Sequence, residues 1–276
     1  MPRMMIQAAV TMNQLQNKLD LIGNNLANSQ TTGYKSRQAD FSSLLFQQMD
    51  NMTDPANAEG RITPDGVRIG SGARLGSAAI DLTPGSISET DRVLDMALLG
   101  KNHFFQIQVT ENGTEETRYT RSGAFYLNPV NNNQSLMLTD PNGNPVLGAD
   151  GPIVMEEGFD SISIRENGEV LVQRGNQTEP AGRIEAVEVV RPRLLEAAGA
   201  NTFRLPELGE LGFQMNEIIQ ELTPNEEILR SNALEHSNVD IAKQMTDMLI
   251  AQRSYQFNAR TISMGDQMMG LINQLR

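Results

Sequence analysis

Residues 5–26 read MIQAAVTMNQLQNKLDLIGNNL, and the apolar residues of this stretch recur in alternating steps of three and four. That spacing forms the a/d seam of a coiled coil, which is narrower than the apolar face of a helix on a broad core. The seam consists of Met5, Ala8, Met12, Leu15, Leu19, Ile22 and Leu26. We therefore expect an N-terminal helix that packs against a second helix; an ordinary amphipathic helix on its own domain is the alternative.

The other end of the chain predicts that second helix. No proline follows Pro224, so a helix from residue 240 to residue 275 is expected, with a length of about 50 Å at about 1.5 Å per residue. One apolar stripe consists of Ile241, Met245, Met248, Tyr255, Ala259, Ile262 and Met269. A second stripe consists of Ile250, Phe257, Met264, Met268, Leu271 and Leu275. A single N-terminal helix cannot cover both stripes, so we expect contacts with other subunits.

The segment after the first seam predicts how the N-terminal helix ends. Residues 24–33 are rich in Asn, Ser and Thr, which compete for backbone hydrogen bonds, and Gly33 can adopt a positive φ. The helix should end in this stretch. Apolar residues then predict a second short helix from Phe41 to Met52. Residues 53–79 are rich in Gly and Pro and are expected to form a loop or linker.

The middle of the chain predicts strands. From about residue 80, short apolar runs alternate with turn signals such as Asn112-Gly113, Pro141-Asn142-Gly143 and Asn167-Gly168. We therefore expect an α+β fold in which the long terminal helices pair as a coiled-coil-like domain around a central all-β domain. The expected parts are a helical part at 1–52, a loop or linker at 53–79, a β domain at 80–220 and a second helical part at 221–276.

Composition excludes several function classes. The chain has 276 residues, with 22 Lys and Arg against 34 Asp and Glu, and a net charge of −12 argues against a nucleic-acid partner. It has no cysteine and only two histidines, which is too few for a typical zinc site. Nucleotide-binding and catalytic motifs are absent as well, so we expect no catalytic residue, cofactor or metal. No apolar stretch approaches the ~18 residues that span a membrane, and the N-terminus does not resemble a cleavable signal peptide.

Two stretches at opposite ends of the chain resemble a known family. Residues 19–35 closely resemble the N-terminal signature of flagellar rod and hook proteins, and residues 234–240 and 252–258 resemble their C-terminal signature. Residues 94–100, 104–105 and 119–125 agree with the same family. The signature positions are Asn24, Asn25, Asn28, Thr31, Gly33, Tyr34, Lys35, Ser237, Asn238, Val239, Gln252, Arg253 and Asn258.

Within the FlgF/FlgG family of rod proteins, the subclass stays open. Residues 66–74 look like the distal rod protein FlgG, whereas residues 143–153 look more like the proximal rod protein FlgF. One position departs from the family: Lys243-Gln244 stands where rod proteins usually carry acidic residues.

The resemblance implies a structural, non-enzymatic subunit of the flagellar basal body, outside the cytoplasmic membrane. Such subunits are exported unfolded through the flagellar type III apparatus and assemble helically with themselves and with other rod and hook proteins. We expect the seam and the first C-terminal stripe to form the assembly interface. The residues expected there are Met5, Met12, Leu15, Leu19, Ile22, Leu26, Ile241, Met245, Met248, Tyr255, Ile262 and Met269. The alternatives are a secreted coiled-coil adaptor or surface protein with a β head, and, more remotely, a cell-wall hydrolase.

Overall fold

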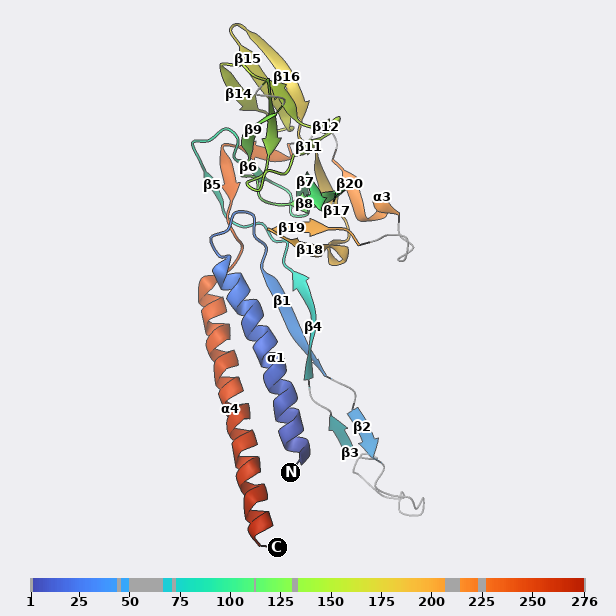
Figure 1. The fold of residues 1–276 in the computed structure, drawn as a ribbon, viewed down its shortest axis with the longest axis vertical. Helices are drawn as coiled ribbons and strands as arrows, with labels where there is room; N and C mark the ends of the chain where they lie inside the picture. Colours follow the sequence, from blue (N-terminus) through green and yellow to red (C-terminus); the bar gives the residue numbers. More distant parts are fainter. Residues whose placement is uncertain are drawn as a thin grey trace, which may run out of the picture. The chain divides into compact units, whose positions relative to one another are not determined.

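The computed structural model describes residues 2–43, 46–49, 67–70, 73–111, 113–130, 134–206, 214–222 and 227–275. The chain divides into two compact units (Figure 1). The terminal unit combines Met1–Leu26, Arg37–Ala79 and Asp240–Arg276. The β unit combines Ala27–Ser36 with Ile80–Val239. Helices at both ends of the chain and strands between them confirm the α+β class.

Two long helices dominate the terminal unit. Helix α1 (Pro2–Ala27) carries the seam, and it ends inside the stretch that predicted its end. Helix α4 (Ile241–Gln274) confirms the expected C-terminal helix. Its first turn is capped by Asp240, whose side chain accepts a hydrogen bond from the backbone N–H of Lys243.

The two helices run antiparallel beside one another (Figure 1). Near the end of α1, Asn25 Nδ2 lies 3.5 Å from Gln244 Oε1 in the first turns of α4. Near the start of α1, Met5 lies against Gly265, where an added Cβ would be 3.0 Å from Met5 Cγ. Coiled-coil packing along this pair remains a prediction.

Among the residues that the structure describes, four strands complete the terminal unit. β1 (Arg37–Ser43) pairs with β4 (Ala73–Ile80). β2 (Phe46–Met49) pairs antiparallel with β3 (Val67–Gly70).

These strands correct two expectations. The helix expected from Phe41 to Met52 is wrong wherever the structure describes that range, and part of the expected loop at 53–79 is strand. The helical spacing gave a wrong prediction because strand formation depends on a pairing partner elsewhere in the chain, here β4 and β3, more than on local propensity. Residues 44–45, 50–66 and 71–72 lie outside the described residues.

The β unit is built on a six-stranded antiparallel sheet in the order β18-β19-β8-β7-β17-β20. Its strands are β7 (His103–Glu111), β8 (Thr114–Thr120), β17 (Ala186–Val189), β18 (Glu196–Gly199), β19 (Thr202–Arg204) and β20 (Ile219–Glu221). Two short helices accompany it, η2 (Pro192–Leu194) and α3 (Met215–Ile218). β7 and β8 form the expected hairpin, with Glu111 opposite Thr114; Asn112 of its turn lies outside the described residues.

Two three-stranded sheets follow in the orders β13-β10-β9 and β14-β15-β16. Their strands are β9 (Tyr126–Val130), β10 (Ser135–Thr139), β13 (Val154–Glu156), β14 (Ser161–Ile164), β15 (Glu169–Arg174) and β16 (Gln177–Arg183). A minimal pair joins β11 (Leu147–Gly148) to β12 (Gly151–Pro152). The Asn167-Gly168 turn between β14 and β15 was predicted correctly. β16 gave no apolar signal because its residues are polar and largely exposed.

Apolar side chains pack on both faces of the six-stranded sheet. Successive residues of a strand point to opposite faces, so Phe105 joins the larger core and Phe104 the smaller one. Phe105 meets Phe125 edge to face at 5.1 Å between ring centroids, and Phe104 meets Phe203 at 5.7 Å.

Two short C-terminal strands belong to the β unit as well. β21 (Leu229–Ser231) pairs with β6 (Met96–Leu98), and β22 (Ala233–Glu235) pairs with β5 (Ile87–Glu89). They bring the chain just before α4 onto strands more than 130 residues earlier in the sequence.

Candidate functional site: a buried ionic cluster between the terminal signatures

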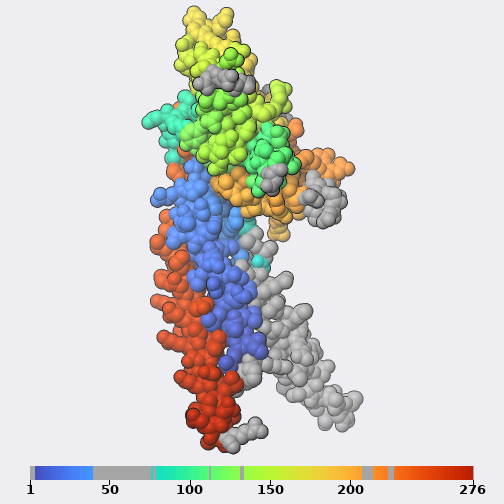
Figure 2. Space-filling model, viewed as in Figure 1, coloured from blue at the N-terminus to red at the C-terminus, as the bar shows by residue number. Residues whose placement is uncertain are grey.

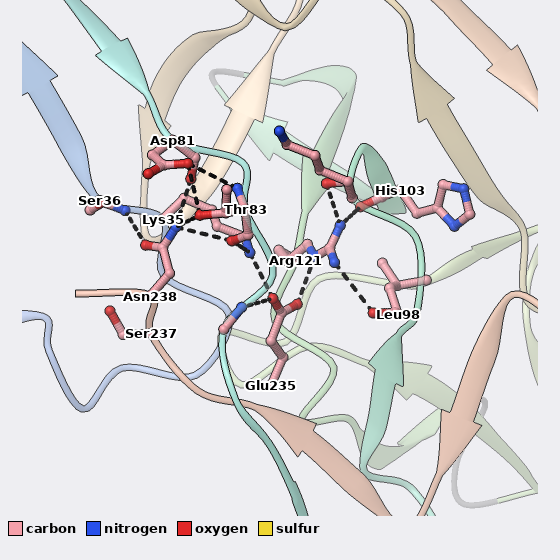
Figure 3. Close-up of polar contacts among 12 residues, drawn as sticks. Lys35, Ser36, Asp81, Thr83, Leu98, His103, Arg121, Glu235, Ser237 and Asn238 are labelled. Atoms are coloured by element: carbon pink, nitrogen blue, oxygen red, sulfur yellow. Dashed lines mark hydrogen bonds and ion pairs between the residues drawn. The ribbon is translucent and has the colours of Figure 1, made fainter. Parts of the chain in front are cut away.

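Parts of both terminal signatures meet inside the β unit (Figure 3). We call residues 27–36, which follow α1, the strap, and residues 233–239, which precede α4, the latch. The loop before β5, residues 81–86, lies with them. The strap and latch thus bring signature residues from the two ends of the chain into one polar site.

Glu235 lies at the centre of the site. Its Oε1 accepts hydrogen bonds from Lys35 Nζ at 2.6 Å and from the backbone N–H of Gly85 at 2.7 Å. Its Oε2 accepts from Arg121 Nε at 2.6 Å. The side chains of Lys35 and Arg121 are 0% exposed and that of Glu235 is 1% exposed. We call Lys35, Arg121 and Glu235 the Glu235 cluster.

Both cations also donate hydrogen bonds to main-chain carbonyl oxygens. Lys35 Nζ also donates to the carbonyl of Thr83 at 2.8 Å. Arg121 donates to the carbonyls of Leu98, Lys101 and His103 (Figure 3). Such bonding is what allows charged groups to be buried, because an unpaired buried charge costs far more free energy than a paired one.

The cluster shifts the pKa of two of its members. Burial lowers the pKa of Lys35 and the charge of Arg121 lowers it further, while the bond to Glu235 opposes both. Burial alone would raise the pKa of Glu235, but the charge of Arg121 and the bonds from both cations outweigh burial, so this pKa is lowered. The carboxylate of Glu235 therefore stays ionised, and both cations share it as their counter-ion.

Asn238 holds the strap beside the cluster. Its Oδ1 accepts from the backbone N–H of Ser36 at 2.7 Å, and its Nδ2 donates to the carbonyl of Asp81 at 2.8 Å. Its family signature position is thus explained by a bridge between strap, latch and the loop before β5 (Figure 3).

Gly33 is required by two independent features of the strap. Its φ is +66°, which L side chains rarely adopt, and an added Cβ would lie 2.5 Å from the carbonyl carbon and oxygen of Arg121. Its backbone N–H donates to the carbonyl of Glu235 at 2.8 Å. A side chain at this position would separate the strap from Arg121 and Ser122, which follow β8.

Asn25 makes a second polar site, within the terminal unit. It is 1% exposed, and its Oδ1 accepts from the backbone N–H of Arg37 at 3.0 Å while Nδ2 donates to the carbonyl of Arg37 at 2.8 Å. Nδ2 also faces Gln244 Oε1. Gln244 is the departure from the family pattern, and a neutral amide oxygen serves here as the acceptor.

The remaining signature positions have smaller roles. Thr31 Oγ1 donates to Asn28 Oδ1 at 3.2 Å, the Ser237 hydroxyl accepts from the backbone N–H of Val239, and Tyr34 is buried. Asn258 Nδ2 donates to the carbonyl one helical turn earlier. Three signature side chains are exposed: Asn24, Gln252 and Arg253.

The residues expected to form the assembly interface divide by burial. Leu15 and Ile22 of the α1 seam are buried, whereas the half-buried ones are Met5, Met12, Leu19 and Leu26. On α4 the exposed ones are Ile241 and Met245, and the half-buried ones are Met248, Tyr255, Ile262 and Met269. The apolar stripes did not predict the buried residues of α4, which are Gln244, Ala251 and Gly265. These residues are small or polar, so no apolar pattern marks them. Their spacing by multiples of seven was the signal that could have predicted a shared helix face.

Sequence reasoning also missed the roles of Arg121 and Glu235. Both lie in stretches that resemble the family, but no local pattern singles them out, because their pairing depends on strands distant in sequence. Among the described residues, no group of three or more His, Asp or Glu side chains could hold a metal ion. In that same part of the chain, no helix is long and apolar enough to cross a membrane.

Comparison with family models gives three matches. The model described as "Flagella basal body rod protein" matches residues 7–35, "Flagellar hook protein FlgE/F/G D1 domain" matches 99–172, and "Flagellar basal body rod FlgEFG protein C-terminal" matches 230–275. Each match contains one member of the Glu235 cluster: Lys35, Arg121 and Glu235 in that order.

Relatives match along the whole chain. The flagellar hook-basal body complex protein FlhP of Bacillus subtilis is 40% identical, covering 100% of both chains. The flagellar basal-body rod protein FlgG of Borreliella burgdorferi is 33% identical over 100% of this chain and 99% of its own. That of Caulobacter vibrioides is 32% identical over 98% and 97%. This protein therefore belongs to the FlgF/FlgG family of flagellar basal-body rod proteins, which places it in the flagellar basal body.

Proposed function

We propose that this rod subunit is exported unfolded by the flagellar type III apparatus and assembles helically with copies of itself through its terminal helices. The observation that carries the proposal is an apolar stripe left uncovered on α4. We expect the terminal helices to form the contacts between subunits, because their sequence predicts more apolar surface than two paired helices can bury.

The second stripe that the sequence predicted on α4 is exposed along its whole length. Its members are Ile250, Phe257, Met264, Met268, Leu271 and Leu275, each between 42% and 89% exposed. In the space-filling view, α4 (red) lies open along most of its length on the visible face (Figure 2). A regular apolar row of this kind on a helix is typical of a surface that packs against another helix.

The magnitude of burial supports repeated assembly contacts. Removing one such side chain from water is worth about 1.5–3 kcal/mol, from which the cost of ordering and association must be subtracted. Several residues repeated in every subunit therefore suffice for a stable polymer. Methionines in the stripe suit the role because their flexible side chains adapt to slightly different neighbours.

The position in the rod is proposed as FlgG-like. The support is that the FlgG proteins of two bacteria match along nearly the whole chain, together with the resemblance of residues 66–74 to FlgG. The FlgF-like alternative rests on residues 143–153 alone.

Phe257→Asp tests the proposal, because Phe257 is 66% exposed and belongs to the stripe. We expect the isolated variant to unfold at the wild-type temperature, whereas cells that carry it should lack a complete rod and should not swim. Ser263→Asp is the matched control: it adds the same charge to an exposed position of α4 outside the stripe. Normal rods and motility in the Phe257→Asp strain would refute assembly through this stripe.

A further inference from the structure

The latch is anchored in the β unit by contacts that do not involve the strap. β22 pairs with β5, so that Ala233 lies opposite Glu89 and Glu235 opposite Ile87. The backbone N–H of His236 donates to the carbonyl of Ser86 at 2.8 Å. Glu235 Oε2 also accepts from Arg121, a residue of the central part of the chain.

The strap also contacts the β unit outside the latch: the carbonyl of Ser36 accepts from the backbone N–H of Asp81, that of Thr32 accepts from Asn201 Nδ2, and Lys35 donates to the carbonyl of Thr83. The latch adds bonds of another kind, because they include the carboxylate that pairs with Lys35. Gly33 donates to the carbonyl of Glu235, Lys35 to its carboxylate, and Ser36 to the side chain of Asn238. Among these three strap residues, Lys35 depends most on the latch, because its ammonium group is fully buried and needs a counter-ion. With Glu235 absent, closing the strap would bury this charge without its counter-ion, beside the like charge of Arg121.

We infer a one-way dependence between the two segments: the latch docks on the β unit by itself, and the strap closes only on a docked latch. The chain that follows α1 is therefore held in place only after the chain that precedes α4 has reached its own site. The strap acts as a closing element that responds to the arrival of a segment 200 residues later in the sequence. This property belongs to the isolated chain and does not depend on the proposed assembly.

Amide hydrogen exchange of the full-length chain, read by mass spectrometry, tests the order of docking. Peptides from the strap and the latch report on closing, and peptides from β7 and β8 report on the fold. Gly33→Val opens the strap directly, because its side chain would meet the carbonyl of Arg121. His236→Pro opens the latch, because proline removes the N–H that bonds to the carbonyl of Ser86. His236→Ala is the control: it keeps that N–H and removes the exposed side-chain contact between His236 Nε2 and Ser88 Oγ.

We expect Gly33→Val to raise exchange in the strap by about tenfold to a hundredfold while the latch stays protected, the range that corresponds to losing a hydrogen bond to a charged group. His236→Pro should raise exchange in both segments, and His236→Ala in neither. Glu235→Gln should open the strap as well, and it stands in for the proline variant if that variant loses protection in β7 and β8. Equal opening of the latch by Gly33→Val, or a latch opened by His236→Pro under a protected strap, would overturn the inference.

Discussion

Lys35 Nζ lies 2.6 Å from Glu235 Oε1, although 200 residues separate the two in sequence and neither side chain reaches solvent. Lys35 belongs to the N-terminal signature, and Glu235 is the last residue of β22, the strand that precedes α4. The pair ties both ends of the chain to Arg121 in the middle, so its energetics should govern the stability of the β unit.

Removing the charge of Glu235 should destabilise the β unit. Glu235→Gln preserves the shape of the side chain but leaves two buried cations without a carboxylate, which costs about 3–5 kcal/mol for a buried pair. Urea unfolding at pH 7 should show this loss as a lower midpoint. Glu169→Gln, which breaks an exposed pair with Arg165, should change the free energy of unfolding by less than about 1 kcal/mol.

The effect of Glu235→Gln should shrink in acid. The pKa of Glu235 is lowered in the folded chain, so its contribution to stability is complete above its unfolded pKa of about 4.3 and is lost as the pH falls through the folded value. The difference between the wild type and Glu235→Gln should therefore narrow below about pH 4. A difference that stays constant from neutral pH into acid would contradict the ionised state of Glu235.

Lys35→Met should partly rescue Glu235→Gln. Methionine fills a similar volume without a charge, so the double variant no longer buries an ammonium that lacks its counter-ion. The double-mutant cycle should give a coupling free energy of about 1–3 kcal/mol between Lys35 and Glu235. Strictly additive losses in urea unfolding would mean that the two groups do not interact energetically.

Tyr119 should make the β unit sensitive to alkali. Burial raises the pKa of Tyr119 to about 12, so between about pH 10 and pH 12 the unfolded chain loses this proton before the folded chain does. Stability should fall across that window by about 2–3 kcal/mol on this account. Tyr119→Phe should reduce the fall, as measured by urea unfolding at each pH. Tyr126→Phe, at an exposed position, is the control. Identical pH profiles for Tyr119→Phe and the wild type would count against the prediction.

The two late glycines of α4 should respond in opposite ways. An added Cβ at Gly270 meets nothing within 4 Å, so Gly270→Ala should stabilise the helix by up to about 1 kcal/mol. Gly265 lies against Met5, and a larger side chain must push Met5 away. Gly265→Leu should therefore lower the melting temperature of the helical circular dichroism signal, and Gly270→Ala should raise it. An equal rise in both variants would show that α1 does not pack at Gly265.

Local signals in the sequence determined the helices and several hairpins. Alternating steps of three and four and the absence of proline after Pro224 predict helices from residues that lie near one another in sequence. For this reason α1 and α4 were predicted close to their observed ends. The hairpin of β7 and β8 and that of β14 and β15 followed for the same reason, because an Asn-Gly turn joins strands adjacent in sequence.

Tertiary structure alone decided the pairings between distant segments. The end of β1, from Phe41, and all of β2 were predicted as a helix from local spacing, but they are strands because they pair with β4 and β3. The chain offers 34 acidic residues as possible partners for Lys35. Only the register of β22 on β5, which sets Glu235 opposite Ile87, brings that one carboxylate between Lys35 and Arg121. A register is a property of two strands together, and a shift by one residue would turn the side chain of Glu235 to the other face of the pair.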